Sequence, residues 1–385
     1  MAASSLAAEP EWRLLLAACT PERGRANAQI ESLLRLPLRW DRIFELAENH
    51  GVQPLLHQSL GLFRNSLARQ SFDILAEKQR TNLHKAMMLS RELILILDAL
   101  TASGIEVMPY KGLALAESVY GDIALRQTGD IDLLIRAKDV ARAREALHTV
   151  NYSPHLRLSA EEEQAYLQSG YEYCFDAPAG HNLLELQWAL QPSFYAVDFS
   201  MEELFHRAVS VSVAGRLTKT PSFEDLFIIL SLHAAKHAWG KLIWICDLAR
   251  IIKREGLDWA RIGSRARRLR IRRILALNLL LANEVLGLSI PAAAEEYVLE
   301  GKERPLADVI KHLLYSGVPM DVESLAYFRL MVKLRESALD RARFIRRLIL
   351  TPGPGEWASI RLPKVLFPLY RMVRVSRLAT RLARS

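Results

Sequence analysis

The stretch from residue 107 to residue 136 constrains the fold of this chain most strongly. It reads VMPYKGLALAESVYGDIALRQTGDIDLLIR, which predicts a strand, a Lys-Gly turn, a helix, a loop and a second strand. Asp130 and Asp132 alternate with apolar residues at the start of the second strand, so their side chains project from one face. Two neighbouring carboxylates repel each other unless a cation lies between them. Mg²⁺ is the natural candidate for such an all-oxygen site.

The hydrophobic pattern divides the chain into three predicted domains. Residues 1–103 predict a helical region without a catalytic motif. Residues 104–221 mix strands with helices, which is typical of a small α/β domain. Residues 222–385 return to helix and include a Pro-Gly break before a basic amphipathic helix at about 363–383. The expected fold class is therefore α/β (α+β), with one mixed sheet flanked by N- and C-terminal helical regions.

The central domain is expected to contain several short strands. They span residues 105–110, 131–135, 171–175, 183–190, 209–213 and 217–220. A turn at residues 178–181, Pro-Ala-Gly-His, is expected to join the third of these strands to the fourth. Helices are expected at residues 113–120 and 138–150, and one long helix at residues 321–350 of the C-terminal region.

Composition excludes several classes of protein. Half of the 385 residues are hydrophobic, which excludes a disordered chain. The three cysteines are far apart in sequence, which argues against a disulfide framework or a zinc cluster and favours a reducing compartment. The first residues lack the pattern of a signal peptide, and the apolar segment 274–288 is too short and too polar to span a bilayer. We therefore expect a cytoplasmic protein.

The net charge of +8 is concentrated in arginine-rich runs at residues 261–273, 341–347 and 371–384. Such runs can attract phosphates, anionic lipid or nucleic acid, or they can form solvated helix faces, which is the commoner arrangement. No recognised nucleic-acid module or aromatic stacking array accompanies them, so nucleic acid is not an expected partner. The last run leaves peripheral membrane contact open.

The motif KGLALAESVYGD…RQTGDIDLLI resembles the nucleotidyltransferase superfamily of the DNA-polymerase-beta type. More narrowly, it is similar to an uncharacterised bacterial nucleotidyltransferase family that pairs a Lys-Gly turn with an Arg-x-x-Gly-Asp-x-Asp-Leu-Leu strand. The similarity covers roughly residues 104 to 250. It implies Mg²⁺-dependent transfer of a nucleotidyl group from a nucleoside triphosphate, ATP or another, with release of pyrophosphate. The genes that often accompany the family suggest a small-molecule, peptide or glycan acceptor.

The resemblance assigns the metal site to three carboxylates. Two Mg²⁺ ions can stabilise the attacking and leaving oxygens of such a transfer. Asp130 and Asp132 would bridge the ions, and Glu185 would be the third carboxylate unless it is an exposed strand acid. Alternation places Gln187 on the same strand face as Glu185. The family more often has histidine at the position of Gln187, and glutamine cannot act as a base. The alternative function is therefore a catalytically degenerate binding or regulatory module.

Three residues are candidates for binding the triphosphate. Gly112 lets the backbone approach the phosphates, and the first amides of the following helix can bind phosphate oxygens. Lys111 supplies a positive charge, and Arg126 can make a bidentate phosphate contact. The alternatives are that Lys111 lies on the surface and that Arg126 forms a salt bridge with a neighbouring acid.

A second polar cluster follows in the C-terminal region. His233 and His237 are four residues apart and share a helix face with Lys236 nearby, and Asp247 follows. The spacing mimics a zinc-protease helix, but Ala234 replaces the required glutamate, so we reject that chemistry. The cluster is a candidate for the acceptor side of the site. The alternative is a polar helix–helix junction in which Asp247 bonds a histidine.

Overall fold

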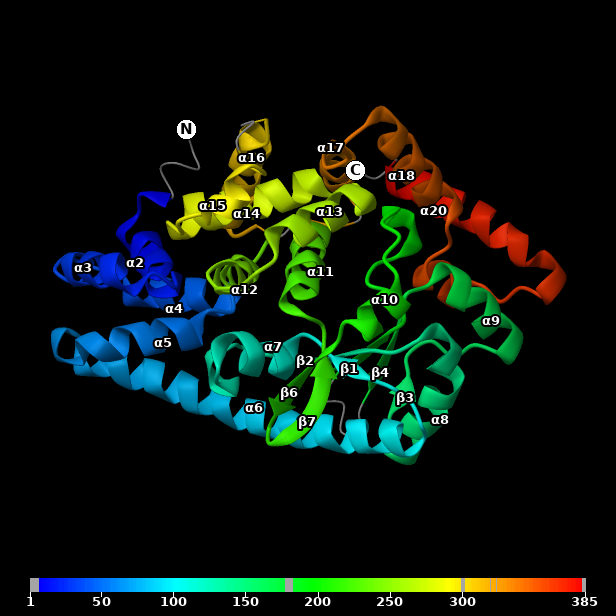
Figure 1. The fold of residues 1–385 in the computed structure, drawn as a ribbon, viewed down its shortest axis with the longest axis horizontal. Helices are drawn as coiled ribbons and strands as arrows, with labels where there is room; N and C mark the ends of the chain where they lie inside the picture. Colours follow the sequence, from blue (N-terminus) through cyan, green and yellow to red (C-terminus); the bar gives the residue numbers. More distant parts are fainter. Residues whose placement is uncertain (1–6, 177–182, 299–301, 319, 323, 383–385) are drawn as a thin grey trace.

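The computed structural model describes residues 7–176, 183–298, 302–318, 320–322 and 324–382. Within these residues the fold combines a central mixed sheet with many helices, which confirms the predicted fold class (Figure 1). The expected turn at 178–181 lies outside the described residues. Among the described helices, none combines the length and apolar character that a membrane span requires.

The central sheet has five strands in the order β1-β2-β5-β4-β3. Strands β2 and β5 run parallel, and the other neighbours are antiparallel. A separate hairpin is formed by β6 and β7. The bounds are β1 Met108–Pro109, β2 Asp130–Leu134, β3 Ser153–Pro154, β4 Glu172–Asp176, β5 Leu183–Gln187, β6 Val209–Val213 and β7 Arg216–Thr220.

The register of the sheet decides which side chains meet. Asp132 on β2 lies opposite Glu185 on β5, and Cys174 on β4 lies opposite Glu185 from the other side. The predicted strand at 105–110 is too long, because only Met108 and Pro109 pair with β2. Proline has no backbone N–H and cannot continue a hydrogen-bond ladder. The chain therefore leaves the sheet shortly before Lys111.

The helices of the N-terminal and central regions pack around the sheet. The long helix α6 runs along the sheet and packs against β2 and α8 (Figure 1). The predicted helix at 113–120 is only partly α-helical, because α7 ends at Leu115 and a π-turn at Ala116–Tyr120 follows. The bounds are α2 Pro10–Cys19, α3 Arg23–Leu33, α4 Trp40–Asn49, α5 Gln53–Leu60, α6 Arg69–Ala102, α7 Gly112–Leu115, α8 Val140–Thr149, α9 Ala160–Ser169 and α10 Met201–His206.

The C-terminal helices follow β7. The single helix predicted at 321–350 is wrong: α17 ends at Lys333, and Ser337 starts a new helix by accepting a hydrogen bond from the Asp340 amide at 3.1 Å. The basic C-terminal helix begins at Tyr370, later than predicted, after a 3₁₀ turn at Lys364–Leu369. The bounds are α11 Phe223–Lys236, α12 Leu242–Ile252, α13 Trp259–Leu269, α14 Arg272–Leu286, α15 Ala292–Glu295, α16 Arg304–Ser316, α17 Leu325–Lys333, α18 Ala338–Leu350, α19 Pro354–Ser359 and α20 Tyr370–Leu382.

Two hydrophobic cores hold these elements together. The first joins helices α2 to α5 with α11 to α16, so the two helical regions share one interior. Trp12 of α2, for example, packs edge-on against Tyr315 of α16 with ring centroids 5.1 Å apart. The second core lies between the sheet and the helices α6 and α8, and it also contains Trp357 and Tyr370. The first residue of β2, Asp130, thus belongs to a sheet that is packed between these cores.

Candidate active site

A cavity of about 580 Å³ lies between the sheet and the helices α11 and α12. Of the eleven site residues predicted from the sequence, eight line this cavity: Lys111, Arg126, Asp130, Asp132, Glu185, His233, Lys236 and His237. The other three, Gly112, Gln187 and Asp247, do not line the cavity but contact residues that do, as described below. The structure therefore brings the predicted residues together from segments that are more than a hundred positions apart.

The carboxylates concentrate negative charge at one wall of the cavity. Asp132 is only 3% exposed, and its strand register places it beside Glu185. Burial raises the pKa of Glu185 to about 8, with further contributions from the charges of Asp132 and Glu172. Burial and Asp132 likewise raise the pKa of Asp130. An oxygen-only donor set with excess negative charge is the chemistry that Mg²⁺ prefers.

Lys111 supplies one counter-charge to this cluster. Its Nζ donates to Oδ1 of Asp132 at 2.7 Å and lies 4.9 Å from the centre of the Tyr110 ring. Burial lowers the pKa of Lys111, but the charges of Asp132, Tyr110 and Glu185 together outweigh it, and the pKa lies well above its ordinary value. Among the described residues, no three His, Cys, Asp or Glu side chains are grouped as a ready metal site. In this structure the counter-charge of Asp132 is therefore Lys111.

The backbone conformation at position 112 requires a glycine. Its φ of +52° lies in the left-handed region that side chains rarely adopt. A Cβ at this position would meet Cγ2 of Thr128 at 3.0 Å and the carbonyl oxygen of Asp130 at 3.2 Å. The glycine therefore lets the turn pack directly against the start of β2. The helix that follows has only four α-helical residues, so we assign no anion site to its amides.

Arg126 is held by a buried acid, which was the alternative left open by the sequence. Its Nε donates to both carboxylate oxygens of Asp247 at 3.0 and 3.2 Å, and Nη2 donates to Oδ2 at 3.0 Å. The hydroxyl of Tyr120 donates to Oδ1 of Asp247 at 2.5 Å. The bonds described for Asp247 thus go to Arg126 and Tyr120 and not to a histidine. Asp247 fixes the guanidinium at the cavity wall.

Gln187 orients Glu185. Its side chain is 2% exposed and accepts a hydrogen bond from the Tyr110 hydroxyl at 2.6 Å. Its amide nitrogen donates to Glu185 at 2.9 Å and to Glu172 at 3.2 Å. A neutral amide can therefore hold two carboxylates in place without adding charge. Sequence reasoning missed Glu172, although the β4–β5 hairpin register, which sets Glu172 opposite Gln187, would have pointed to it.

The histidine pair forms an uncharged aromatic wall. The rings of His233, His237 and Trp244 have centroids 4.7 to 5.4 Å apart. Burial and neighbouring lysines lower the pKa of both histidines, so they are neutral at pH 7. Lys236 donates to the Tyr171 hydroxyl at 3.2 Å, and its ammonium lies 4.9 Å from the Tyr171 ring centre. Burial lowers the pKa of Lys236, against the pull of Glu172.

Two further cations line the cavity and were not identified from the sequence. Lys85 of α6 and Lys241, which precedes α12, are both exposed. Neither forms an ion pair with any acid that the structure describes. Their positions bring positive charge to the same opening as the carboxylates. Only the folded arrangement of α6 across the sheet reveals Lys85, because that helix carries no recognisable motif.

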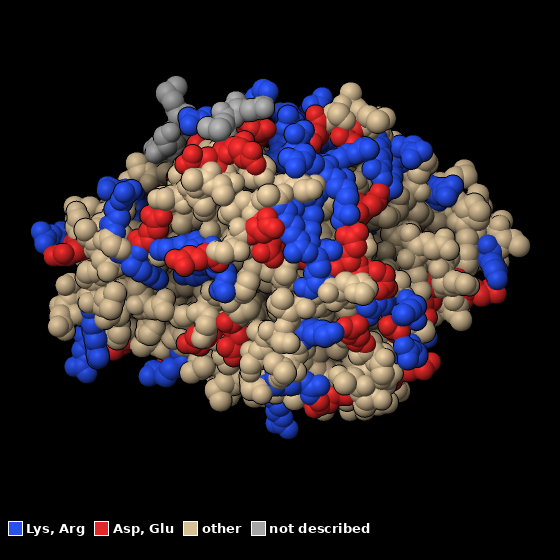
Figure 2. Space-filling model, viewed as in Figure 1, with Lys and Arg blue, Asp and Glu red and all other residues tan. Residues whose placement is uncertain are grey.

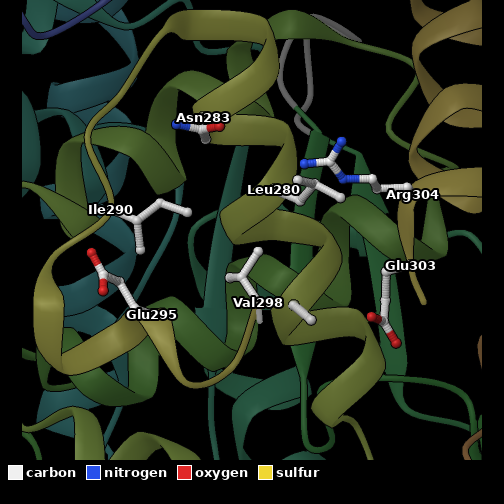
Figure 3. Close-up of a pocket in the computed structure, with 8 residues that line it drawn as sticks. Leu280, Asn283, Ile290, Glu295, Val298, Glu303 and Arg304 are labelled. Carbon is white, nitrogen blue, oxygen red and sulfur yellow. The ribbon is translucent and has the colours of Figure 1, made fainter. Parts of the chain in front are cut away.

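Two other cavities differ from this one. A cavity of about 260 Å³ shares Tyr171, Lys236 and His237 with it and is otherwise largely aromatic and apolar. A separate cavity of about 400 Å³ lies beside α14 (Figure 3). Glu295 and Glu303 stand on opposite sides of that cavity, so its acids do not converge on one point (Figure 3). We therefore assign the chemistry to the carboxylate-lined cavity.

Comparison with known protein families shows that this chain is a nucleotidyltransferase. The chain belongs to a family of uncharacterised nucleotidyltransferases, whose sequence model matches residues 37–287. This match extends the resemblance beyond the motif region, into the helices on both sides. No curated protein matches the chain.

Similar solved structures include two of the antibiotic-resistance factor ANT(2'')-Ia. The solution structure is 14% identical, covers 48% of this chain and 93% of its own, and has a TM-score of 0.36. The crystal structure with adenylyl-2''-tobramycin is 15% identical, covers 48% and 98%, and has a TM-score of 0.35. An antigenic nucleotidyltransferase-like protein from Paracoccidioides brasiliensis is 16% identical, covers 52% and 94%, and has a TM-score of 0.30.

Proposed function

We propose that this protein transfers a nucleotidyl group from a nucleoside triphosphate to an acceptor bound in the carboxylate-lined cavity. The acceptor nucleophile forms a bond to the α-phosphorus, and the bond to the bridging oxygen breaks. Pyrophosphate leaves with the electron pair, and the nucleophile loses its proton. The observation that carries this proposal is the meeting of Asp130, Asp132 and Glu185 on two adjacent parallel strands, with Lys111 and Arg126 beside them.

The metal in this proposal is Mg²⁺, held by Asp130, Asp132 and Glu185. Their oxygens match its preferred donors. Burial, together with the charges of Asp132 and Glu172, raises the pKa of Glu185, and a cation would offset this negative charge. When bound, Mg²⁺ stabilises charge on the attacking and leaving oxygens. Gln187 holds Glu185 in position through its 2.9 Å hydrogen bond. Glu185 then orients the acceptor rather than the nucleotide.

The triphosphate is proposed to lie against the cations of the cavity. Lys85 and Lys241 stand at its opening and Lys236 lies further in. Arg126 uses Nε and Nη2 on Asp247, so we assign Nη1 as the group that meets a phosphate oxygen. Lys111 would turn from Asp132 to the phosphates when metal occupies that carboxylate.

The acceptor is proposed to bind in the adjoining cavity of about 260 Å³. The two cavities share Tyr171, Lys236 and His237, which supports an acceptor body on the Glu185 side of the site. Phe194 and Phe328 supply apolar walls there. A volume of this size suits a small molecule, or one residue of a peptide or glycan. A polynucleotide is not proposed, since the cavity offers no extended stacking surface.

A nucleotide with Mg²⁺ is expected to raise the melting temperature of the protein. A ligand at a hundredfold excess over its Kd stabilises the folded state by about 2.7 kcal/mol. The gain should shrink in Arg126→Ala, because a charged phosphate contact is lost. The measurement is differential scanning fluorimetry with each of the four triphosphates, with and without Mg²⁺.

Pyrophosphate release separates the enzyme from a module that only binds. The Lys111–Asp132 ion pair is the observation that favours the binding module, since it neutralises one proposed ligand. Slow metal-dependent pyrophosphate formation with water as the surrogate acceptor supports catalysis. Tight Mg²⁺-nucleotide binding without pyrophosphate, across all four triphosphates and a broad acceptor panel, would instead support the regulatory function.

Lys111→Met is expected to strengthen metal binding and to weaken turnover. Removing a cation within about 4 Å of the metal ligands favours a divalent ion by about tenfold or more in Kd. Turnover should fall, because the phosphates lose a positive charge. Isothermal titration with Mn²⁺ alone measures the first effect, and pyrophosphate release measures the second. Lys85→Met is the matched control: it should weaken nucleotide binding and leave the metal Kd within about twofold. Unchanged metal affinity in Lys111→Met would contradict the exchange of cations at Asp132.

A further inference from the structure

Exposed apolar side chains gather in one segment, residues 345–375. Nine of the 23 exposed large hydrophobic residues in the described chain fall within these 31 residues, so they are not a random scatter. They belong to the last turns of α18, the connection that follows, and the first turns of α20. They are Ile345, Ile349, Leu350, Ile360, Val365, Leu366, Leu369, Met372 and Val375. We call their exposed side the C-terminal face.

The C-terminal face is part of an ordered structure. Trp357 and Tyr370 pack with ring centroids 4.0 Å apart, and Phe367 lies 5.5 Å from Trp357. The Tyr370 hydroxyl donates to the carbonyl of Ile360 at 2.9 Å. The aromatic side chains of the segment therefore point inward, while aliphatic ones such as Val365, at 83% exposed, point outward. The segment thus packs its aromatic residues and exposes only aliphatic ones.

Further contacts of α20 hold this face together. The Nε of Arg374 on α20 donates to the carbonyl of Leu348 on α18 at 3.1 Å. Arg374 and Arg377 also face Glu356 of α19, at 3.5 and 3.4 Å. The outer sides of α18 and α20 are therefore held beside each other at one end of the molecule (Figure 1).

The exposed charged residues of this segment are all positive. Residues 345–375 contain six arginines and lysines and a single acid, Glu356, which is buried. Arg346, Arg361 and Arg371 are exposed among the aliphatic side chains, and no ion pair with a described acid is found for them. Lys364 is exposed too, but it lies 3.4 Å from Glu161. In the α13 region, Arg268 and Arg270 pair with Glu203 and Asp340. Figure 2 shows blue and red atoms side by side over α13, whereas the region of α20 is mostly tan.

We propose that the C-terminal face docks on the surface of a lipid bilayer that contains anionic phospholipid. Aliphatic side chains flanked by arginine and lysine bind at the boundary between headgroups and acyl chains, where both kinds of side chain are satisfied. A second copy of the chain would bring the same positive charge to the face and be repelled. The segment also supplies Gly353, Glu356 and Arg374 to the adjoining cavity, so docking would bring that cavity to the membrane surface.

Vesicle sedimentation with the full-length protein tests this proposal. We expect binding to phosphatidylcholine vesicles that contain phosphatidylglycerol, weak binding to phosphatidylcholine alone, and loss of binding as salt is raised. Replacing Val365 and Met372 with glutamate should reduce the partition coefficient by about tenfold or more, because two apolar contacts become charged repulsions. Both side chains are largely exposed, at 83% and 67%, so folding should survive.

Matched controls separate membrane docking from general stickiness. Leu62→Glu and Leu217→Glu alter side chains that are 69% and 73% exposed outside this face, and they should leave vesicle binding unchanged. If the double variant fails to keep its circular-dichroism melting profile, Val365→Ser replaces it. Absence of binding, equal binding to neutral vesicles, or equal loss in the controls overturns the proposal. A dimer in light scattering that Val365→Ser dissociates would assign the face to a second copy instead.

Discussion

Asp130→Asn and Asp132→Asn are each expected to reduce the rate of pyrophosphate release by about a thousandfold or more. Removing a group that stabilises a transition state typically lowers kcat by this order of magnitude. Each substitution removes one carboxylate that we assign to the metal. Their effects on stability without metal should differ in sign. Asp130 is destabilised by burial and by Asp132, so its neutralisation should hold or raise the melting temperature.

Asp132→Asn should instead lower stability. Lys111 is buried against Asp132 at 2.7 Å, and removal of its partner leaves a buried ammonium with weaker compensation. Removing one member of a buried ion pair costs about 3–5 kcal/mol, and asparagine retains part of that through its carbonyl oxygen. Thermal melts without Mg²⁺ and pyrophosphate assays with it measure the two effects. Wild-type turnover in either variant would show that the metal assignment is wrong. Equal melting changes would show that Lys111 is not the counter-charge of Asp132.

Glu185→Gln provides an internal comparison for the acceptor side. Glu185 lies across the strand pair from Asp132 and is bonded by Gln187. If it orients the acceptor, the variant should lose turnover far more than nucleotide affinity, and kcat and the nucleotide Kd separate these effects. Equal loss of both would show that Glu185 supports nucleotide binding or the fold and not the acceptor side.

The sequence was sufficient for the central geometry because strand alternation is local. The period of two placed Asp130 and Asp132 on one face, and Glu185 and Gln187 on one face, without knowledge of the fold. The parallel pairing of β2 with β5 is non-local and was not predicted, since the family resemblance implied only that Glu185 is the third carboxylate. The structure adds the register, which sets Asp132 rather than Asp130 directly opposite Glu185.

Other features depended on contacts that no local pattern encodes. Glycine at 112 was predicted to admit a triphosphate, whereas its close neighbours are Thr128 and the carbonyl of Asp130. Lys85 faces the cavity because α6 crosses the sheet, and its own helix gives no sign of this. Helix ends were missed where a single hydroxyl decides them, as at Ser337.

Asp247→Ala is expected to destabilise the protein strongly, by about 3–5 kcal/mol, because it leaves the Arg126 guanidinium buried without a counter-charge. Arg126 is 8% exposed and directs two of its three nitrogens at Asp247, which also receives the Tyr120 hydroxyl. Burial opposes the charge on Arg126, yet Asp247 raises the pKa of the guanidinium, so the pair is strongly coupled. Urea unfolding followed by circular dichroism measures the loss as a shift of the midpoint.

Asp198→Ala is the matched control for this prediction. Asp198 also pairs with two arginines, Arg343 and Arg347, but its side chain is 59% exposed. Water screens such a pair, so the control should change stability by about 1 kcal/mol or less. A double variant, Arg126→Met with Asp247→Leu, should recover most of the stability lost in Asp247→Ala, because no buried charge remains. It should still fail to bind the triphosphate tightly if Arg126 meets a phosphate. Recovery of both stability and nucleotide affinity would show that the Arg126–Asp247 pair only links the segment before β2 to α12.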